Sequence, residues 1–313
     1  MTDHLLRRLA PVSSEGWELL DAEAKDRLTV ALGARRLVDF AGPHGWEHSA
    51  TNLGRVGPVV SAPAEQVIAR TRRVLPLTEV RADFSLRREE LVNATRGAVD
   101  VDLGPLDEAA HRIASVENAA VFEGWDAVGI TGIVPSSPHD PIRHDGGTSG
   151  YDDLVASAVA TLKHSGIGGP YALALGPADW TAVVEASDAG GYPLVRRLED
   201  LLGGPIEWVP GLDGGVVLSM RGGDYLLEVG EDLSIGYASH DAETVDLYLE
   251  ESLSFRVATP EAAVSIRLAA DLMARTLDML APFLAGTTDS AQASRSSRAS
   301  APVSYTHLTL PTN

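Results

Sequence analysis

The residues best suited to chemistry lie in one short run, His139-Asp140-Pro-Ile-Arg-His144-Asp145. Imidazole nitrogens and carboxylate oxygens are common ligands of zinc and other divalent ions. The spacing does not favour a metal site, because histidines five positions apart share neither a helical face nor a strand face. Pro138 and Pro141, with Gly146 and Gly147, mark a turn-rich segment. We therefore expect a solvated surface loop and no metal site.

Sequence patterns of other common active sites are missing. The chain has no Gly-Lys dipeptide of a phosphate-binding loop, no Gly-x-Ser-x-Gly elbow and no His-Glu-x-x-His helix. A Ser–His–acid triad is assembled in space, and nothing in the sequence nominates one. The chain also has no cysteine, which excludes disulfides, thiolate metal ligands and cysteine nucleophiles. We expect no catalytic residue, no bound cofactor and no enzymatic activity.

Composition limits the possible partners. The 313 residues are 44% apolar and carry a formal net charge of −19. This apolar content suffices for a buried core in one large or two ordinary domains. Nucleic-acid binding requires clustered Lys and Arg, so the acidic charge opposes it. No apolar run is long enough for a membrane helix, and the amino terminus lacks a secretory signal. We expect a cytoplasmic protein without nucleic-acid or membrane partners.

Apolar spacing predicts several helices. Apolar residues recur at three- and four-residue steps from 13 to 40, with Ser13 or Ser14 as the N-cap. Residues 105–122 form a second predicted helix, which begins at a proline and ends before Gly124. Its buried side is expected to carry Ile113, Val116, Ala120 and Val121. Further helices are predicted at 151–164, 178–187 and 194–202.

Strand signals complete an α+β chain. Residues 52–74 combine Gly and Pro with short Val-rich pieces, which is typical of an extended hairpin arm. Residues 171–175 form an apolar run that fits a central strand. Alternating segments at 216–220, 225–229, 245–250 and 253–257 predict four more strands.

The chain changes character after Leu268. An apolar stripe predicts an extra helix over residues 269–285. Residues 286–313 are expected to form a disordered tail, because small polar residues cannot bury enough surface to offset chain entropy. Within this tail, residues 303–313 look like translated sequencing-adapter read-through and are excluded from the fold.

Two runs of the chain together resemble the encapsulins. These are Gly33-Ala-Arg-Arg-Leu-Val-Asp-Phe-Ala-Gly-Pro-His-Gly-Trp46 and Asp232-Leu-Ser-Ile-Gly-Tyr237. Smaller landmarks of the family occur along the chain in the family's order, at residues 9–12, 17, 42–47, 75–81, 122–124, 169–171, 191–194, 221–224 and 259–262. The resemblance extends from residue 1 to about residue 268.

The resemblance implies the Hong Kong 97-type phage major capsid fold. It assigns residues 1–48, 81–124 and 226–268 to a discontinuous peripheral domain. Residues 49–80 become the elongated loop, and residues 125–225 become the axial domain.

The function implied by the resemblance is that of a structural shell protein. Copies of the chain would self-assemble into an icosahedral nanocompartment, which encloses a cargo enzyme through the cargo's C-terminal targeting peptide. The implied cargo is a dye-decolourising peroxidase or a ferritin-like protein, serving oxidative-stress defence or iron storage. A tailed-phage or prophage major capsid protein is the alternative, although the short amino terminus and acidic charge favour an encapsulin. A bacteriocin-type or protease-type enzyme is a weaker alternative, since no nucleophile and base are found.

The resemblance also implies a cargo-peptide site. Its residues are Leu28, Leu32, Arg35, Asp39, Ile235 and Ser254. Apolar side chains of an extended peptide would insert beside the leucines and Ile235, while Arg35 and Asp39 hold its backbone or termini. The alternative is that the leucines are ordinary core and that Arg35 pairs with Asp39, four positions away.

Two further implications concern a pore and a flavin. The loop Ser187, Asp188, Ala189, Gly190, Gly191 and Tyr192 matches the segment that surrounds the five-fold pore. A ring of Asp188 carboxylates would favour cations, and a plain turn between two helices is the alternative.

Some encapsulins bind flavin beside a Trp after the elongated loop. Positions 87–89 carry no aromatic residue here, so no flavin is predicted.

Overall fold

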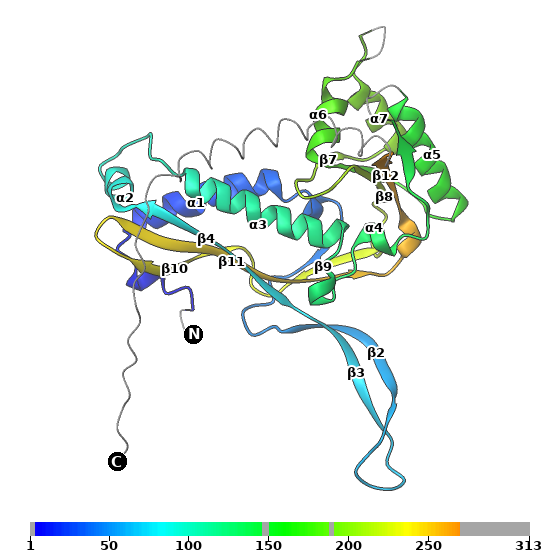
Figure 1. Ribbon diagram of the computed structural model, residues 1–313, viewed down its shortest axis with the longest axis horizontal. Coiled ribbons are helices and arrows are strands. Elements are labelled where there is room, and N and C mark those ends of the chain that lie inside the picture. Colours follow the sequence, from blue (N-terminus) through cyan, green and yellow to red (C-terminus); the bar gives the residue numbers. More distant parts are fainter. Residues whose placement is uncertain (1–3, 146–149, 188–190, 270–313) are drawn as a thin grey trace, which may run out of the picture. The chain divides into compact units, whose positions relative to one another are not determined.

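The structure is a computed structural model that describes residues 4–145, 150–187 and 191–269 (Figure 1). The chain divides into two compact units, Met1–Arg267 and Leu268–Asn313. Almost all of the second unit lies outside the described residues, and so do the predicted helix at 269–285, except its first residue, and the predicted tail. No helix among the described residues is both long enough and apolar enough to span a membrane.

Helix α1 (Ser14–Ala31) begins as predicted, because the Ser13 side chain accepts a hydrogen bond from the Gly16 N–H at 3.1 Å. The prediction that it continues to residue 40 is wrong. The helix ends at Ala31, and a 3₁₀ turn (Ala34–Arg36) and strand β1 (Asp39–Ala41) follow. Asn118 causes the break, since its side chain binds both the Ala31 carbonyl and the Ala34 N–H. A distant side chain therefore caps the end of α1.

Helix α3 (Gly104–Phe122) matches its prediction, and Gly124 ends it with a positive φ of 85°. Ile113, Ala120 and Val121 are buried as expected. The prediction for Val116 is wrong, because this side chain is 39% exposed. The buried face is instead centred on positions that include Glu117 and Asn118, whose polar side chains are fully buried.

The first sheet has the strand order β1-β9-β11-β10, and β4 also pairs with β11. Its strands are β1, β4 (Thr78–Arg87), β9 (Tyr225–Val229), β10 (Ser234–His240) and β11 (Thr244–Val257). Strand β9 has its predicted bounds, whereas the two strands predicted at 245–250 and 253–257 form the single strand β11. Glu251 and Ser252 interrupt the apolar pattern, but they pair with Val80 and Glu79 of β4 and keep the ladder continuous. Helices α1 and α3 lie together along this sheet (Figure 1).

The second sheet has the strand order β5-β12-β8-β6-β7. Its strands are β5 (Ile142–His144), β6 (Tyr171–Leu175), β7 (Ile206–Trp208), β8 (Gly215–Ser219) and β12 (Ala263–Leu268). Three helices accompany them, α5 (Tyr151–His164), α6 (Pro177–Glu185) and α7 (Leu194–Leu202). Helices α5 and α7 and strand β6 have the predicted bounds, and every residue of β6 is buried. Short helices α2 (Arg88–Thr95) and α4 (Ile133–Ser136) complete the order.

Strands β2 (Ala50–Val60) and β3 (Ala69–Pro76) form an antiparallel two-stranded arm, which confirms the predicted hairpin. The arm extends away from the first sheet (Figure 1). Several of its apolar side chains are exposed, including Val56, Val59 and, at 76%, Ile68. Exposed apolar side chains gathered on one element mark a surface for a partner.

Candidate functional site

A groove of about 500 Å³ lies between α1 and β10. It is lined by Arg7, Asp21, Ala24, Lys25, Leu28, Thr29, Leu32, Arg35, Asp232, Leu233, Ser234, Ile235 and Leu249. Leu28, Leu32, Ile235 and Leu249 are buried residues of the hydrophobic core, so they supply an apolar floor. Charged side chains from α1 and from the turn before β10 form the rim.

Four of the six residues expected at the peptide site meet in this groove, namely Leu28, Leu32, Arg35 and Ile235. The two leucines also belong to the hydrophobic core, so lining the groove and packing in the core are compatible roles for them. The groove-lining residues Leu233 and Leu249 were missed. The run 232–237 that carried the resemblance was the only signal for Leu233.

Asp39 and Ser254, the other two expected residues, do not line this groove. Strand β1 pairs with β9, and the Asp39 carboxylate there accepts a hydrogen bond from the Gly223 N–H at 2.6 Å. Ser254 is buried in β11, where its hydroxyl bonds with the Thr51 hydroxyl. The chain leaves the groove after the 3₁₀ turn. Asp39 is only four residues from Arg35, but it lies beside the loop that contains Gly223.

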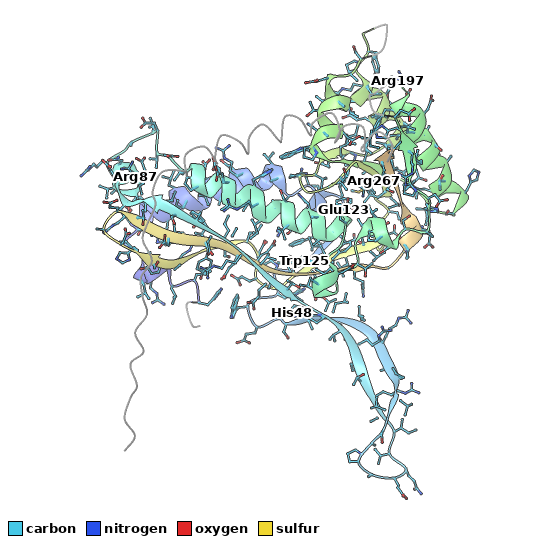
Figure 2. All side chains as sticks on the ribbon, viewed as in Figure 1. His48, Arg87, Glu123, Trp125, Arg197 and Arg267 are labelled. Carbon is cyan, nitrogen blue, oxygen red and sulfur yellow. The ribbon has the colours of Figure 1, made fainter. Side chains whose placement is uncertain are left out.

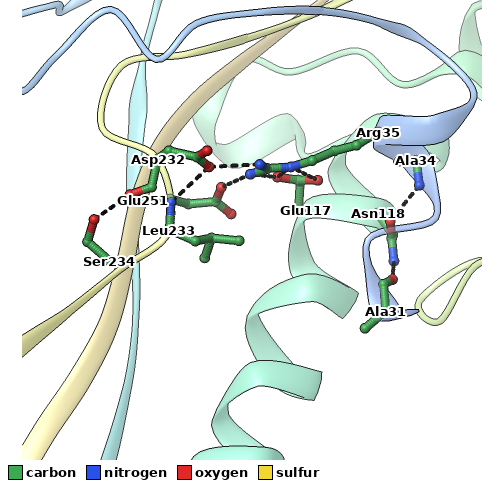
Figure 3. A network of polar contacts seen from close by, with 9 residues as sticks. All are labelled: Ala31, Ala34, Arg35, Glu117, Asn118, Asp232, Leu233, Ser234 and Glu251. Atoms are coloured by element: carbon green, nitrogen blue, oxygen red, sulfur yellow. Dashed lines mark hydrogen bonds and ion pairs between the residues drawn. The ribbon is translucent and has the colours of Figure 1, made fainter. Parts of the chain in front are cut away.

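Arg35 is the centre of a buried ionic network (Figure 3). Its guanidinium donates to the Glu117 carboxylate at 2.6 and 2.8 Å, to Asp232 at 2.7 Å and to Glu251 at 2.9 Å. The predicted alternative of an Arg35–Asp39 pair is therefore wrong. The network joins four segments, which are the turn after α1, helix α3, strand β11 and the turn before β10.

The network has more negative than positive charge. The side chains of Glu117 and Glu251 are 0% exposed, so neither charge is screened by water. Burial raises the pKa of Glu251 well above its ordinary value, the Glu117 charge raises it further, and Arg35 opposes both effects. Burial by itself would lower the pKa of Arg35, but the surrounding carboxylates raise it above its usual range. Arg35 thus stays charged.

Arg7 closes one end of the groove. Its guanidinium forms a two-fold contact with Asp21 at 2.8 and 2.6 Å, and its Nε donates to the Ile235 carbonyl at 2.7 Å. The Tyr237 N–H donates to the Leu5 carbonyl at 2.8 Å. The outer edge of β10 is therefore already hydrogen-bonded to the amino-terminal segment.

The expected pore loop connects α6 and α7. Ser187 bridges to Pro193, and the Leu194 N–H donates to the Ala186 carbonyl at 3.1 Å, so the two ends of the loop are held together. Gly191 has a positive φ of 80°, and Tyr192 is exposed. Asp188, Ala189 and Gly190 lie outside the described residues.

The run from His139 to Asp145 does not bring its two histidines to a common centre. The His139 ring contacts the Glu261 carbonyl at 3.0 Å, while the His144 ring lies 3.7 Å from the Asp179 carboxylate. The prediction that the whole run is a loop was wrong, because residues Ile142–His144 form strand β5 at the sheet edge.

Comparisons with known proteins agree with this architecture. Residues 1–254 match a family model described as an encapsulating protein for peroxidase. The type 1 encapsulin shell protein of Rhodospirillum rubrum is 44% identical over 268 residues, covering 84% of this chain and 96% of that protein. The type 1 encapsulin shell protein of Mycobacterium tuberculosis is 39% identical over 264 residues, covering 84% of this chain and 99% of that protein.

A solved structure shares the fold. The virus-like particle protein of Pyrococcus furiosus matches with a TM-score of 0.56 at 15% identity, covering 80% of this chain and 98% of that one. The expected Hong Kong 97-type capsid fold is confirmed. With a family model that covers most of its length and relatives about 40% identical, the chain belongs to the encapsulin family of shell proteins.

Proposed function

We propose that this chain is the subunit of a closed icosahedral shell in the cytoplasm, and that the shell encloses a cargo enzyme. The carboxy-terminal peptide of the cargo docks in the groove between α1 and β10. The observation that carries this proposal is the groove itself, in which Leu28, Leu32, Ile235 and Leu249 form an apolar floor beside a charged rim. Named relatives that are shell proteins support the same role.

The exposed apolar side chains of the β2–β3 arm favour assembly of the subunits. Strands β2 and β3 pair with each other, and exposed side chains such as Val59 and Ile68 have no apolar cover among the described residues. A second copy of the chain is the partner that fits, because a shell of one subunit type needs a repeated contact. In this proposal, residues 49–80 are the elongated loop that lies across the neighbouring subunit.

The remaining regions take the roles of the capsid fold. Residues 125–225, which contain most of the second sheet and helices α5–α7, form the axial domain around the symmetry axes. Residues 1–48, 81–124 and 226–268 form the peripheral domain. The loop between α6 and α7 surrounds a five-fold pore, where repeated Asp188 carboxylates favour cations over anions.

A dye-decolourising peroxidase is the first choice of cargo, since the matching family is described as an encapsulating protein for peroxidase. A ferritin-like protein is the second. An extended peptide enters the groove by inserting apolar side chains onto its floor, because the edge of β10 is occupied by the amino-terminal segment. Arg35 contributes mainly by keeping the groove in shape, since its three nitrogens already donate to carboxylates.

The test combines microscopy with a pair of matched substitutions. The chain is produced with a fluorescent protein that carries the carboxy-terminal peptide of a peroxidase cargo, and shells are isolated by size. Thr29→Arg places a long side chain in the groove, whereas Val30→Arg changes the next residue of α1, which is exposed and does not line the groove.

We expect closed shells from all three proteins and a several-fold loss of fluorescence from the Thr29→Arg shells alone. Equal loading of the two variants would contradict docking in this groove. Soluble subunits without shells from the unmodified chain would contradict the container role.

A further inference from the structure

His44, His48 and Glu228 form a cluster outside the groove. One donor atom from each lies within 4.8 Å of the other two, and this is the one such group of three found among the described residues. The sequence did not nominate it, since Glu228 lies 180 residues from His48. The cluster sits where the chain passes from β1 into the arm, and Figure 2 shows His48 at this junction.

The backbone around the cluster is fixed by hydrogen bonds to the end of β9. The His44 N–H donates to the Val229 carbonyl at 3.1 Å, and the Gly45 N–H donates to the Gly230 carbonyl at 2.8 Å. Strand pairing places Ala41 opposite Glu228. The two histidines are thus presented to the carboxylate by backbone that the sheet holds in place.

The side chains already face one another. The His48 Nε2 lies 2.7 Å from a Glu228 carboxylate oxygen, and the rings of His44 and His48 have centroids 4.8 Å apart. The side chains of His48 and Glu228 are 29% and 13% exposed, while His44 is exposed. An ion can therefore reach the cluster from solvent on the side of the exposed His44 ring.

The geometry points to a binding site for a divalent transition-metal ion, with Zn²⁺ as the preferred ion. Zinc bonds of about 2.0–2.2 Å to nitrogen and oxygen place tetrahedral ligand atoms about 3.4 Å apart, so small side-chain rotations suffice to close the site. Two imidazoles with one carboxylate select zinc over calcium and magnesium, which prefer oxygen ligands. Three protein ligands leave one position for water or for a further donor.

A bound ion would cross-link the base of the arm to the first sheet. Glu228 pairs in register with Ser254 of β11, and Ser254 bonds with Thr51 at the start of the arm. The metal would add a second tie at the same junction, between the loop before β2 and β9. This role is independent of cargo docking, which takes place at the groove.

The test uses the full chain, purified without a polyhistidine tag and stripped with a chelator. Zinc binding is measured by equilibrium dialysis with metal analysis for the unmodified protein, His44→Ala, Glu228→Gln and the control His164→Ala. His164 is an exposed histidine at the end of α5, so the control removes an imidazole without touching the cluster.

We expect one zinc ion per subunit in the unmodified protein and in the control. Losing a ligand should weaken binding by about tenfold or more in the other two variants. Unchanged affinity in His44→Ala, or no stoichiometric zinc in the unmodified protein, would overturn the site. Because His44 is exposed, its loss should not unfold the chain, and this variant decides the matter if Glu228→Gln does not fold.

Discussion

Removing the charge of Arg35 should destabilise the subunit strongly. In Arg35→Met, Glu117 and Glu251 keep fully buried carboxyl groups and lose the cation that both contact. Breaking a buried ion pair by removing one partner costs about 3–5 kcal/mol. The unfolding entropy of a unit the size of Met1–Arg267 is about 0.6 kcal/mol per kelvin. The midpoint of thermal unfolding should therefore fall by about 5–9 °C at pH 7.

Uncompensated buried charge is the expected cause of this loss, and a companion variant separates charge from packing. Arg35→Met combined with Glu117→Leu and Glu251→Leu removes all three buried charges at once. Buried ion pairs replaced by apolar side chains of similar volume are often neutral or stabilising. We expect the triple variant to recover most of the lost midpoint. Arg35→Lys should lie between the two, because an ammonium cannot reproduce the forked contact with Glu117.

The pH dependence gives a second readout of the same network. The folded-state pKa of Glu251 is raised above the ordinary value of 4.5, so the folded chain binds this proton more tightly than the unfolded chain. The stability that this group contributes is therefore complete below about pH 4.5 and is lost as the pH rises through the raised pKa. Glu251→Gln should flatten this part of the profile.

The assay is intrinsic tryptophan fluorescence during heating, at one fixed subunit concentration for every variant. Scans at several pH values from 4.5 to 8 give both readouts. A fall of less than about 2 °C for Arg35→Met, which corresponds to roughly 1 kcal/mol, would refute the proposed cost. A triple variant that is less stable than Arg35→Met would show that shape and not charge dominates this site.

Three further perturbations follow from particular contacts. Asn118→Ala should lower stability by about 2–4 kcal/mol, since its buried side chain bonds the Ala31 and Pro210 carbonyls and the Ala34 N–H; a chemical-denaturation midpoint equal to wild type would exclude this role. Gly33→Ala should also destabilise, because a Cβ there would lie 2.4 Å from the Trp208 carbonyl oxygen, and unchanged thermal unfolding would show that the contact yields. Ile68→Asp, at an exposed site of the arm, should leave the helical signal in circular dichroism unchanged but reduce shell yield in size-exclusion chromatography; normal shells would contradict assembly through the arm.

Local patterns in the sequence were sufficient for the elements whose signals lie within the element itself. The bounds of α5, α7 and β6 were predicted, because the apolar period of the two helices and the continuous apolar run of β6 are set by their own residues. The hairpin arm followed from its Gly and Pro content, and the N-cap of α1 was narrowed to Ser13 or Ser14, of which Ser13 is the cap. The family resemblance then placed these pieces in one fold and nominated the groove residues Leu28, Leu32 and Ile235.

Local sequence patterns gave wrong element bounds and wrong partners where polar residues are buried in the core. Asn118 ends α1 although it lies 84 residues further along the chain. The polar residue Glu251 predicted a break between two strands, but it lies within the continuous strand β11. Arg35 joins Glu117 and Glu251 across separations of 82 and 216 residues, so a nearby Asp39 was the wrong partner to expect.

The sequence by itself determined most element positions, because apolar periodicity depends on neighbouring residues, and its resemblance to the encapsulins indicated the fold and the family. Only the tertiary structure decided which buried charges meet, how the groove is bounded and that His44, His48 and Glu228 converge. A buried polar group is stable only beside a matching partner, and in this chain those partners come from distant segments that the fold alone brings together.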